Sequence, residues 1–110
     1  MVEESRRLNH RETPPREDLQ IVQAVLEAYG RALGAHPAGD NGDILAALTG
    51  RNPLGLVFVP PDHPSIDPDG RLLDRWGTPI FFDSMSRSET RLRSAGPDKS
   101  LWTGDDLVVD

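Results

Sequence analysis

The chain lacks cysteine, so its 110 residues can form neither a disulfide nor a thiolate that serves as a nucleophile or zinc ligand. It also lacks a long apolar run, since its longest uninterrupted stretch, residues 44–48, has only five residues and residues 56–59 form a stretch of four. A helix that spans a bilayer needs about 20 apolar residues, and a signal peptide needs an apolar central region. We therefore expect no membrane contact by this fragment.

Positive charge is scarce and scattered. Twelve lysine and arginine residues face 18 acidic residues, which gives a formal net charge of −6. The nearest approach to a basic patch is Arg87, Arg91 and Arg93, whose alternation with other residues is typical of a half-exposed strand. Nucleic acids and anionic membranes are bound by clustered cations. We therefore expect no nucleic-acid partner.

Motifs for catalysis are missing as well. The sequence has no G-x-S-x-G, Walker A or G-x-G-x-x-G pattern, and no nucleophile beside a recognisable base. His10, His36 and His63 lack the spacing of zinc sites. Aspartates are frequent in the proline-rich segment 60–70, where they favour turns. We expect that the protein is not an enzyme.

An amphipathic helix is predicted over residues 15–33. Thr13 offers a capping hydroxyl, Pro15 suits the first turn of a helix, and Gly34 suits its end. Apolar residues recur at steps of three and four, which places them on one face of the helix. These residues are Leu19, Val22, Leu26, Tyr29 and Leu33, with Ile21 and Val25 beside them. A shorter helix is expected over residues 44–49, after a turn at 40–43.

Strands are predicted only after the helices. Residues 56–59 suggest a buried strand, and residues 72–73 suggest a short one. Residues 78–83 and 90–94 suggest two antiparallel strands joined by the turn at 84–89. Helices first and strands last indicate an α+β fold, in which the long N-terminal helix packs on a small antiparallel β-sheet.

Three segments in the last third of the chain carry a family resemblance. Residues 73–80 read LDRWGTPI, residues 94–98 read SAGPD, and residues 104–107 read GDDL. In this order and spacing they resemble the C-terminal half of type II secretion pseudopilins, whose pattern runs roughly L-x-D-P-W-G-N-P-Y, S-x-G-P-D-G and G-T-D-D-D-I. Upstream, residues 16–37 resemble the helix of that family, which ends in a tyrosine and a G-x-Y-P turn.

The first of these segments is expected to form a tight turn. Gly77 is expected at positive φ, where glycine has no steric penalty, and Trp76 is expected to be mostly buried. Arg75 and Thr78 stand where the family usually has proline and asparagine.

The resemblance covers about residues 16–109 and implies a pilin-like fold. We accordingly expect a pseudopilin-like globular domain over residues 14–110, with an acidic C-terminal loop, behind a flexible charged lead-in over residues 1–13. Pseudopilins begin with a long apolar membrane helix, which this sequence does not contain. The chain is therefore either a piece of a membrane-anchored parent or a soluble relative. An in-frame apolar segment upstream of Met1 would distinguish the two.

The resemblance also implies a calcium site in the acidic loop. Its ligands would be the carboxylates of Asp98, Asp105 and Asp106, completed by carbonyls near Leu92 and Ser94 and by water. Hard cations take about 6–8 oxygen ligands of these kinds. Calcium is thus the expected cofactor.

The sequence departs from the family pattern within this loop. Gly104 replaces the first acid of the D-D-D run and removes one potential ligand, and Lys99 replaces a glycine. The alternative is a solvated loop whose carboxylates accept hydrogen bonds from Ser94, Lys99 or Thr103. Trp102 is expected either to cover the loop or to act as an interface residue, because tryptophan is enriched at binding hot spots.

The function that the resemblance implies is structural. Pseudopilins assemble through their N-terminal helices into a short periplasmic fibre of the type II secretion machine, with the globular heads on the outside. The expected partners are other pseudopilin subunits and secretion-machine components, and the isolated fragment is expected to be a monomer. Its location would be the periplasmic face of the inner membrane if a membrane helix precedes it. The alternative is a soluble pilin-fold binding module with no filament role.

Overall fold

The computed structural model describes residues 8–9 and 13–110, which form an α+β fold. The expected lead-in over residues 1–13 lies mostly outside the described residues. The described residues contain two helices, α2 (Pro15–Leu33) and α3 (Asn41–Leu48), and three strands, β1 (Phe81–Ser86), β2 (Glu89–Ser94) and β3 (Leu107–Val109). The strands form one antiparallel sheet in the order β1-β2-β3.

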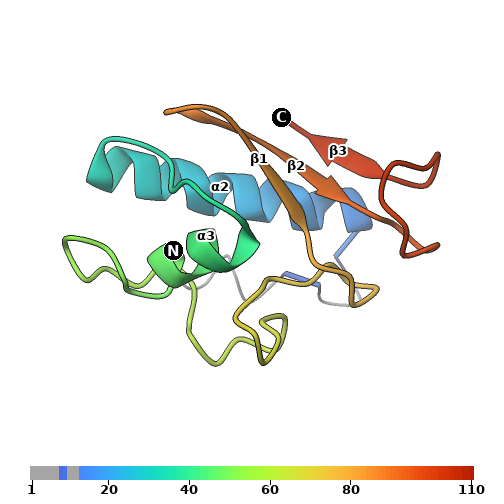
Figure 1. Ribbon diagram of the computed structural model, residues 1–110, viewed down its shortest axis with the longest axis horizontal. Coiled ribbons are helices and arrows are strands. Elements are labelled where there is room, and N and C mark those ends of the chain that lie inside the picture. The colour runs from blue at the N-terminus through green and yellow to red at the C-terminus, as the bar shows by residue number, and fades with distance from the viewer. Residues whose placement is uncertain (1–7, 10–12) are drawn as a thin grey trace.

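Helix α2 and the sheet form two layers that share one core. Figure 1 shows α2 running across one face of the sheet, and α2 packs against β2 and β3. Helix α3 adds Ile44, Leu45 and Leu48 to the same core. The predicted arrangement of a long helix on a small antiparallel sheet is therefore confirmed. Among the described residues, no helix is both long enough and apolar enough to cross a bilayer.

Helix α2 has the predicted bounds but not the predicted cap. Its N-cap residue is Pro14, and no side chain caps the helix. Thr13 is buried, and its carbonyl oxygen accepts a hydrogen bond from the guanidinium of Arg75. The prediction of a Thr13 cap is wrong, because the two prolines carry the chain directly into the first turn. At the other end, Gly34 adopts the left-handed conformation and its N–H donates to Gly30, as expected of a terminal glycine.

The predicted apolar stripe of α2 forms the centre of the core. Leu19, Val22, Leu26 and Tyr29 are buried, and Leu33 is partly buried against the same cluster. Two further apolar residues that widen the stripe, Ile21 and Val25, are buried as well. The helix is therefore held by its apolar face on the sheet, as the spacing of these residues predicts.

The turn at Trp76 and Gly77 is built around the Asp74 carboxylate. One carboxylate oxygen accepts hydrogen bonds from the N–H groups of Trp76 and Thr78, at 3.0 and 2.9 Å. The backbone N–H of Asp74 donates to the Thr78 carbonyl at 2.8 Å, which closes the turn. Gly77 has a φ of +86°, as expected, and Trp76 is partly buried.

We expect Gly77→Val to destabilise the protein by about 1–3 kcal/mol, because a β-branched residue is strained at positive φ. A Cβ at Gly77 would meet no atom within 4 Å, so the effect isolates the backbone strain. Gly104→Val is the matched control, since Gly104 is equally open and does not have a left-handed φ. Urea denaturation of both variants provides the measurement. Equal midpoints for the two variants would contradict the strain at Gly77.

Residues 56–59 do not form a strand, so this prediction is wrong. Phe58 and Val59 are buried, but their N–H groups donate to the carbonyl of Leu48 at 2.8 and 3.1 Å. Leu56 and Val57 are exposed. The segment covers the C-terminal end of α3 instead of joining the sheet, because a helix end has carbonyl groups without partners within the helix.

Three other predicted boundaries are also wrong. Residues 72–73 form only isolated bridges, to Ile66 and Pro79. The β1–β2 hairpin turns between Ser86 and Glu89, so the predicted strand over 78–83 lies three residues further on. Helix α3 begins three residues before the expected residue 44. Its start is set by a capping box in which Asp40 and Asp43 each accept a hydrogen bond from the other's N–H group.

Candidate functional site

The acidic loop, residues 95–106, connects β2 to β3 at one end of the sheet (Figure 1). Its first residues lie directly against its last. Gly96 has a φ of +76°, and a Cβ atom there would lie 2.3 Å from the carbonyl oxygen of Asp105. Only glycine fits this close approach, so the G-P-D segment closes the loop on itself.

Asp106 is the central carboxylate of the loop. Its side chain is only 2% exposed, and it forms an ion pair with Arg93 on β2, with 2.9 Å between Nη1 and Oδ2. The same oxygen accepts a hydrogen bond from the backbone N–H of Trp102 at 2.6 Å, and Oδ1 lies 3.3 Å from the Thr103 hydroxyl. Oδ2 is therefore occupied by two donors of the protein itself, whereas the Thr103 hydroxyl near Oδ1 lies closer to Asp98, at 2.6 Å.

These donors shift the pKa of Asp106. Burial of the carboxyl group opposes ionisation, but the hydrogen bonds from Arg93, Trp102 and Thr103 outweigh it, so the pKa lies below the ordinary value for aspartate. A carboxyl group whose pKa is lowered by folding stabilises the native state above its unfolded pKa, which is about 3.9. The stabilisation by this ion pair is therefore complete at neutral pH and is lost only as the pH falls through the acidic range.

The other two predicted carboxylates lie at the surface. Asp98 accepts hydrogen bonds from the Thr103 hydroxyl at 2.6 Å and from the Ser100 N–H at 3.0 Å. The Thr103 hydroxyl thus lies between Asp98 and Asp106. This position agrees with the alternative to a calcium site, in which hydrogen bonds to the carboxylates hold the loop. Asp105 is exposed, and its N–H lies 3.4 Å from the same hydroxyl.

The two residues expected to supply carbonyl ligands belong to β2. Leu92 is fully buried in the sheet, where it pairs with Phe82 and Val109. Ser94 is also buried, and its hydroxyl donates to the carboxylate of Asp74 at 2.8 Å instead of to the acidic loop. That bond connects the end of β2 to the Trp76–Gly77 turn.

In this arrangement the predicted calcium ligands do not form a ready cage. Within residues 8–9 and 13–110, no three His, Cys, Asp or Glu side chains come together to hold a metal ion. A cation at Oδ2 of Asp106 would also have to replace Arg93 and the Trp102 N–H. Calcium binding therefore stays a prediction from the family resemblance.

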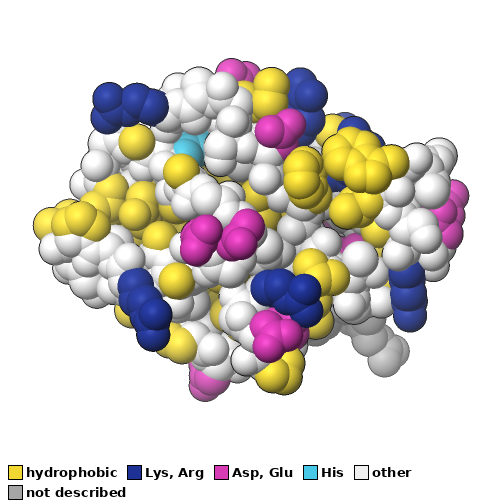
Figure 2. Space-filling view, in the orientation of Figure 1, with side chains coloured by type: hydrophobic (Ala, Val, Ile, Leu, Met, Phe, Trp, Pro, Cys, Tyr) yellow, Lys and Arg dark blue, Asp and Glu magenta, His cyan; other side chains and the backbone are white. Residues whose placement is uncertain are grey.

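Trp102 is the most exposed aromatic side chain of this region, with 66% of its surface accessible. It has a φ of +70°, which is unusual for a bulky residue. Its ring contacts Phe81 edge-on, with 5.3 Å between the ring centres, and the Arg93 guanidinium lies over it at 4.4 Å. Figure 2 shows apolar side chains gathered on this part of the surface. Trp102 thus covers Arg93 and also faces outward, where a partner could reach it.

Arg93 is the residue of this site that the sequence pattern did not assign to the loop, whereas Thr103 was expected as a hydrogen-bond donor to its carboxylates. Arg93 is part of the scattered basic group on β2, and its side chain is 22% exposed. In the sheet, Arg93 on β2 pairs with Val108 on β3, and this register places Arg93 beside Asp106, the residue that precedes β3. Val108 is the second residue after the loop, so the closeness of Arg93 to Asp106 can be inferred only once the strand pairing is known.

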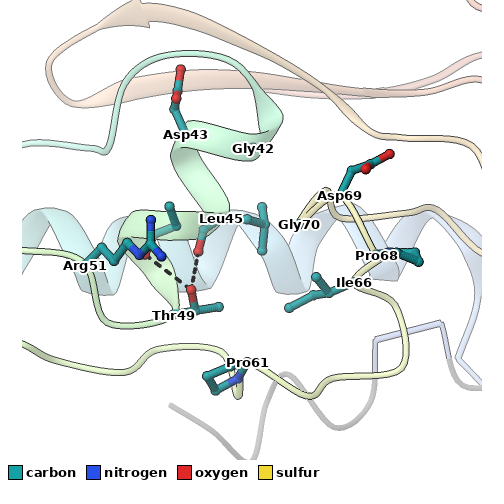
Figure 3. A pocket seen from close by; sticks show the side chains of 11 residues that line it. Gly42, Asp43, Leu45, Thr49, Arg51, Pro61, Ile66, Pro68, Asp69 and Gly70 are labelled. Atoms are coloured by element: carbon teal, nitrogen blue, oxygen red, sulfur yellow. Dashed lines mark hydrogen bonds between the residues drawn. The ribbon is translucent and has the colours of Figure 1, made fainter.

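A separate groove of about 480 Å³ lies between α3 and the segment 61–70 (Figure 3). Its polar groups serve the local structure. The Thr49 hydroxyl donates to the carbonyl of Leu45 within the helix, at 2.8 Å, and Asp43 belongs to the capping box. Asp69 lies 3.5 Å from the guanidinium of Arg71. We assign no chemistry to this groove.

Comparison with known proteins adds no relative. No family model, curated protein or solved structure matches the chain. The resemblance to pseudopilins therefore stays a prediction from the motifs quoted above.

Proposed function

We propose that this chain is the globular head of a pseudopilin-like structural subunit of the type II secretion fibre. The observation that carries the proposal is the meeting of two motif segments that lie far apart in the sequence. The Ser94 hydroxyl, at the start of the S-A-G-P-D segment, donates to the carboxylate of Asp74, in the L-D-R-W-G segment, at 2.8 Å. Both residues are buried. The motifs are thus parts of one structural unit at the end of the sheet.

The order of elements also supports the proposal. A long amphipathic helix comes first, an antiparallel sheet packs on it, and the acidic loop forms the last connection of that sheet. In the proposed role, α2 continues the stalk of the fibre and the sheet faces outward. Neighbouring subunits and secretion-machine components are the partners, and the exposed ring of Trp102 is a candidate contact.

The second candidate is a pilin-fold binding module with no filament role. It is favoured by a groove of about 250 Å³ beside Phe81, which is mostly apolar and lies close to the exposed Trp102. Concave, mostly apolar surfaces are typical of ligand-binding sites.

Cross-linking in cells separates the two functions. The chain is expressed behind a pseudopilin membrane helix in a bacterium that carries a type II secretion machine, with a photo-reactive amino acid at position 102. We expect a ladder of covalent multimers that requires the machine, because subunits of a fibre repeat at fixed distances. The same amino acid at position 54, where Leu54 is also exposed, shows whether the contact is specific. Monomers alone at both positions would contradict the fibre role, and one adduct of constant mass would favour the binding module.

A further inference from the structure

We propose that the guanidinium of Arg93 is the cation of the acidic loop, so that the protein closes this loop itself and needs no metal ion to do so. The inference concerns the loop alone and stands whether or not the chain assembles into a fibre. It accounts for three observations together: the buried carboxylate of Asp106, the position of Arg93 and the unusual backbone of Trp102.

The ion pair satisfies the carboxylate without help from solvent. The Asp106 side chain is only 2% exposed, and a carboxylate so screened from water is destabilised when its cation is removed. Arg93 supplies the positive charge at 2.9 Å, and the Trp102 N–H supplies a second hydrogen bond to the same oxygen. Charge-assisted hydrogen bonds of this kind are stronger than bonds between neutral groups.

Arg93 and a divalent cation would compete at this carboxylate. Calcium binds oxygen ligands, and because Arg93 and the Trp102 N–H occupy Oδ2, only Oδ1 of this carboxylate is left for a cation. A doubly charged ion beside the guanidinium would also be repelled by it. The Thr103 hydroxyl donates to Asp98 and lies 3.3 Å from Asp106, and Asp98 and Asp105 are both exposed carboxylates of the loop.

Trp102 completes the arrangement. Its left-handed backbone points its N–H at Asp106, and its ring lies over the guanidinium at 4.4 Å with an edge contact to Phe81. A cation over the face of an indole ring is attracted to it. The ring therefore shields Arg93 from solvent on one side, and its fluorescence reports whether the ion pair is intact.

The test compares arginines of the same strand in the full chain. Arg93→Gln removes the buried charge, whereas Arg91→Gln removes an arginine whose partner, Asp110, is exposed. We expect Arg93→Gln to lower the melting temperature by about 5 °C or more and Arg91→Gln to change it little. In a Trp76→Phe background, acrylamide should quench Trp102 more strongly once Arg93 is replaced. The melting temperature of Arg93→Lys should lie between those of Arg93→Gln and the unmodified chain. Lysine keeps the charge but lacks the planar guanidinium that stacks on Trp102 and pairs with Asp106.

Calcium gives the decisive comparison. The melting temperature of the unmodified chain should be the same in 5 mM calcium chloride and in excess EDTA. A rise with calcium that Asp98→Ala or Asp106→Ala abolishes would overturn the proposal and establish the calcium site that the resemblance implies. Equal melting temperatures for Arg93→Gln and Arg91→Gln would overturn it as well. If Arg93→Gln does not fold, the same comparison is made with Arg93→Lys, whose melting temperature should lie below that of Arg91→Lys.

Discussion

Arg75→Ala will destabilise the protein by about 3–5 kcal/mol, the largest effect that we expect from a single charged residue. The Arg75 guanidinium lies 2.7 Å from the carboxylate of Asp18 in the first turn of α2. The Asp18 side chain is 6% exposed, and it otherwise accepts a hydrogen bond from the N–H of Asn9 at 3.0 Å. Removing Arg75 therefore leaves a buried negative charge without its cation. Urea denaturation at neutral pH measures the loss.

Two further variants identify the mechanism. Arg71→Ala should cost less than about 1 kcal/mol, because the Arg71 side chain is 46% exposed and its ion pair with Asp67 is solvated. The double change Asp18→Leu with Arg75→Met should be less harmful than Arg75→Ala alone, since it removes the buried charge together with its partner. A double variant that is as unstable as Arg75→Ala would contradict the electrostatic explanation and indicate a packing role for the arginine stem.

Leu26→Ala is expected to cost about 2–5 kcal/mol, the usual range for a large-to-small change in a core. Leu26 is fully buried at the centre of the face that α2 presents to the sheet. Its removal leaves a cavity that a rigid helix on a sheet cannot fill by collapse. Leu54→Ala, at a leucine that is 60% exposed, serves as the control and should change the unfolding free energy by less than about 0.5 kcal/mol. Similar losses at the two leucines would contradict the two-layer core.

The Asp18–Arg75 pair connects the start of the helix to the turn at Gly77. Arg75 lies within the L-D-R-W-G segment, and it reaches the carbonyl of Thr13 as well as the Asp18 carboxylate. Asp74, its neighbour, bonds to Ser94 at the end of β2. The turn therefore joins the helix to the sheet through hydrogen bonds of its side chains, although it forms no strand itself.

Several features were predictable from the sequence because they depend on residues that are close together in the chain. The bounds of α2 follow from a 3.6-residue apolar period, two prolines and a terminal glycine. The left-handed backbone of Gly77 follows from a turn of a few residues. The α+β class follows from the order of these local patterns. Each is set by hydrogen bonds and side-chain spacing within a few residues.

The tertiary structure decided the features that depend on partners far along the chain. Residues 56–59 have the composition of a strand, yet their N–H groups are taken by the end of α3. Asp18 meets Arg75 across 57 positions, and Arg93 meets Asp106 across the turn of the acidic loop. The sequence predicts a calcium ligand at Asp106, and it distinguishes none of the other three from ordinary charged residues. Burial gives these four residues their importance, because a charge that water no longer reaches must find its partner within the protein.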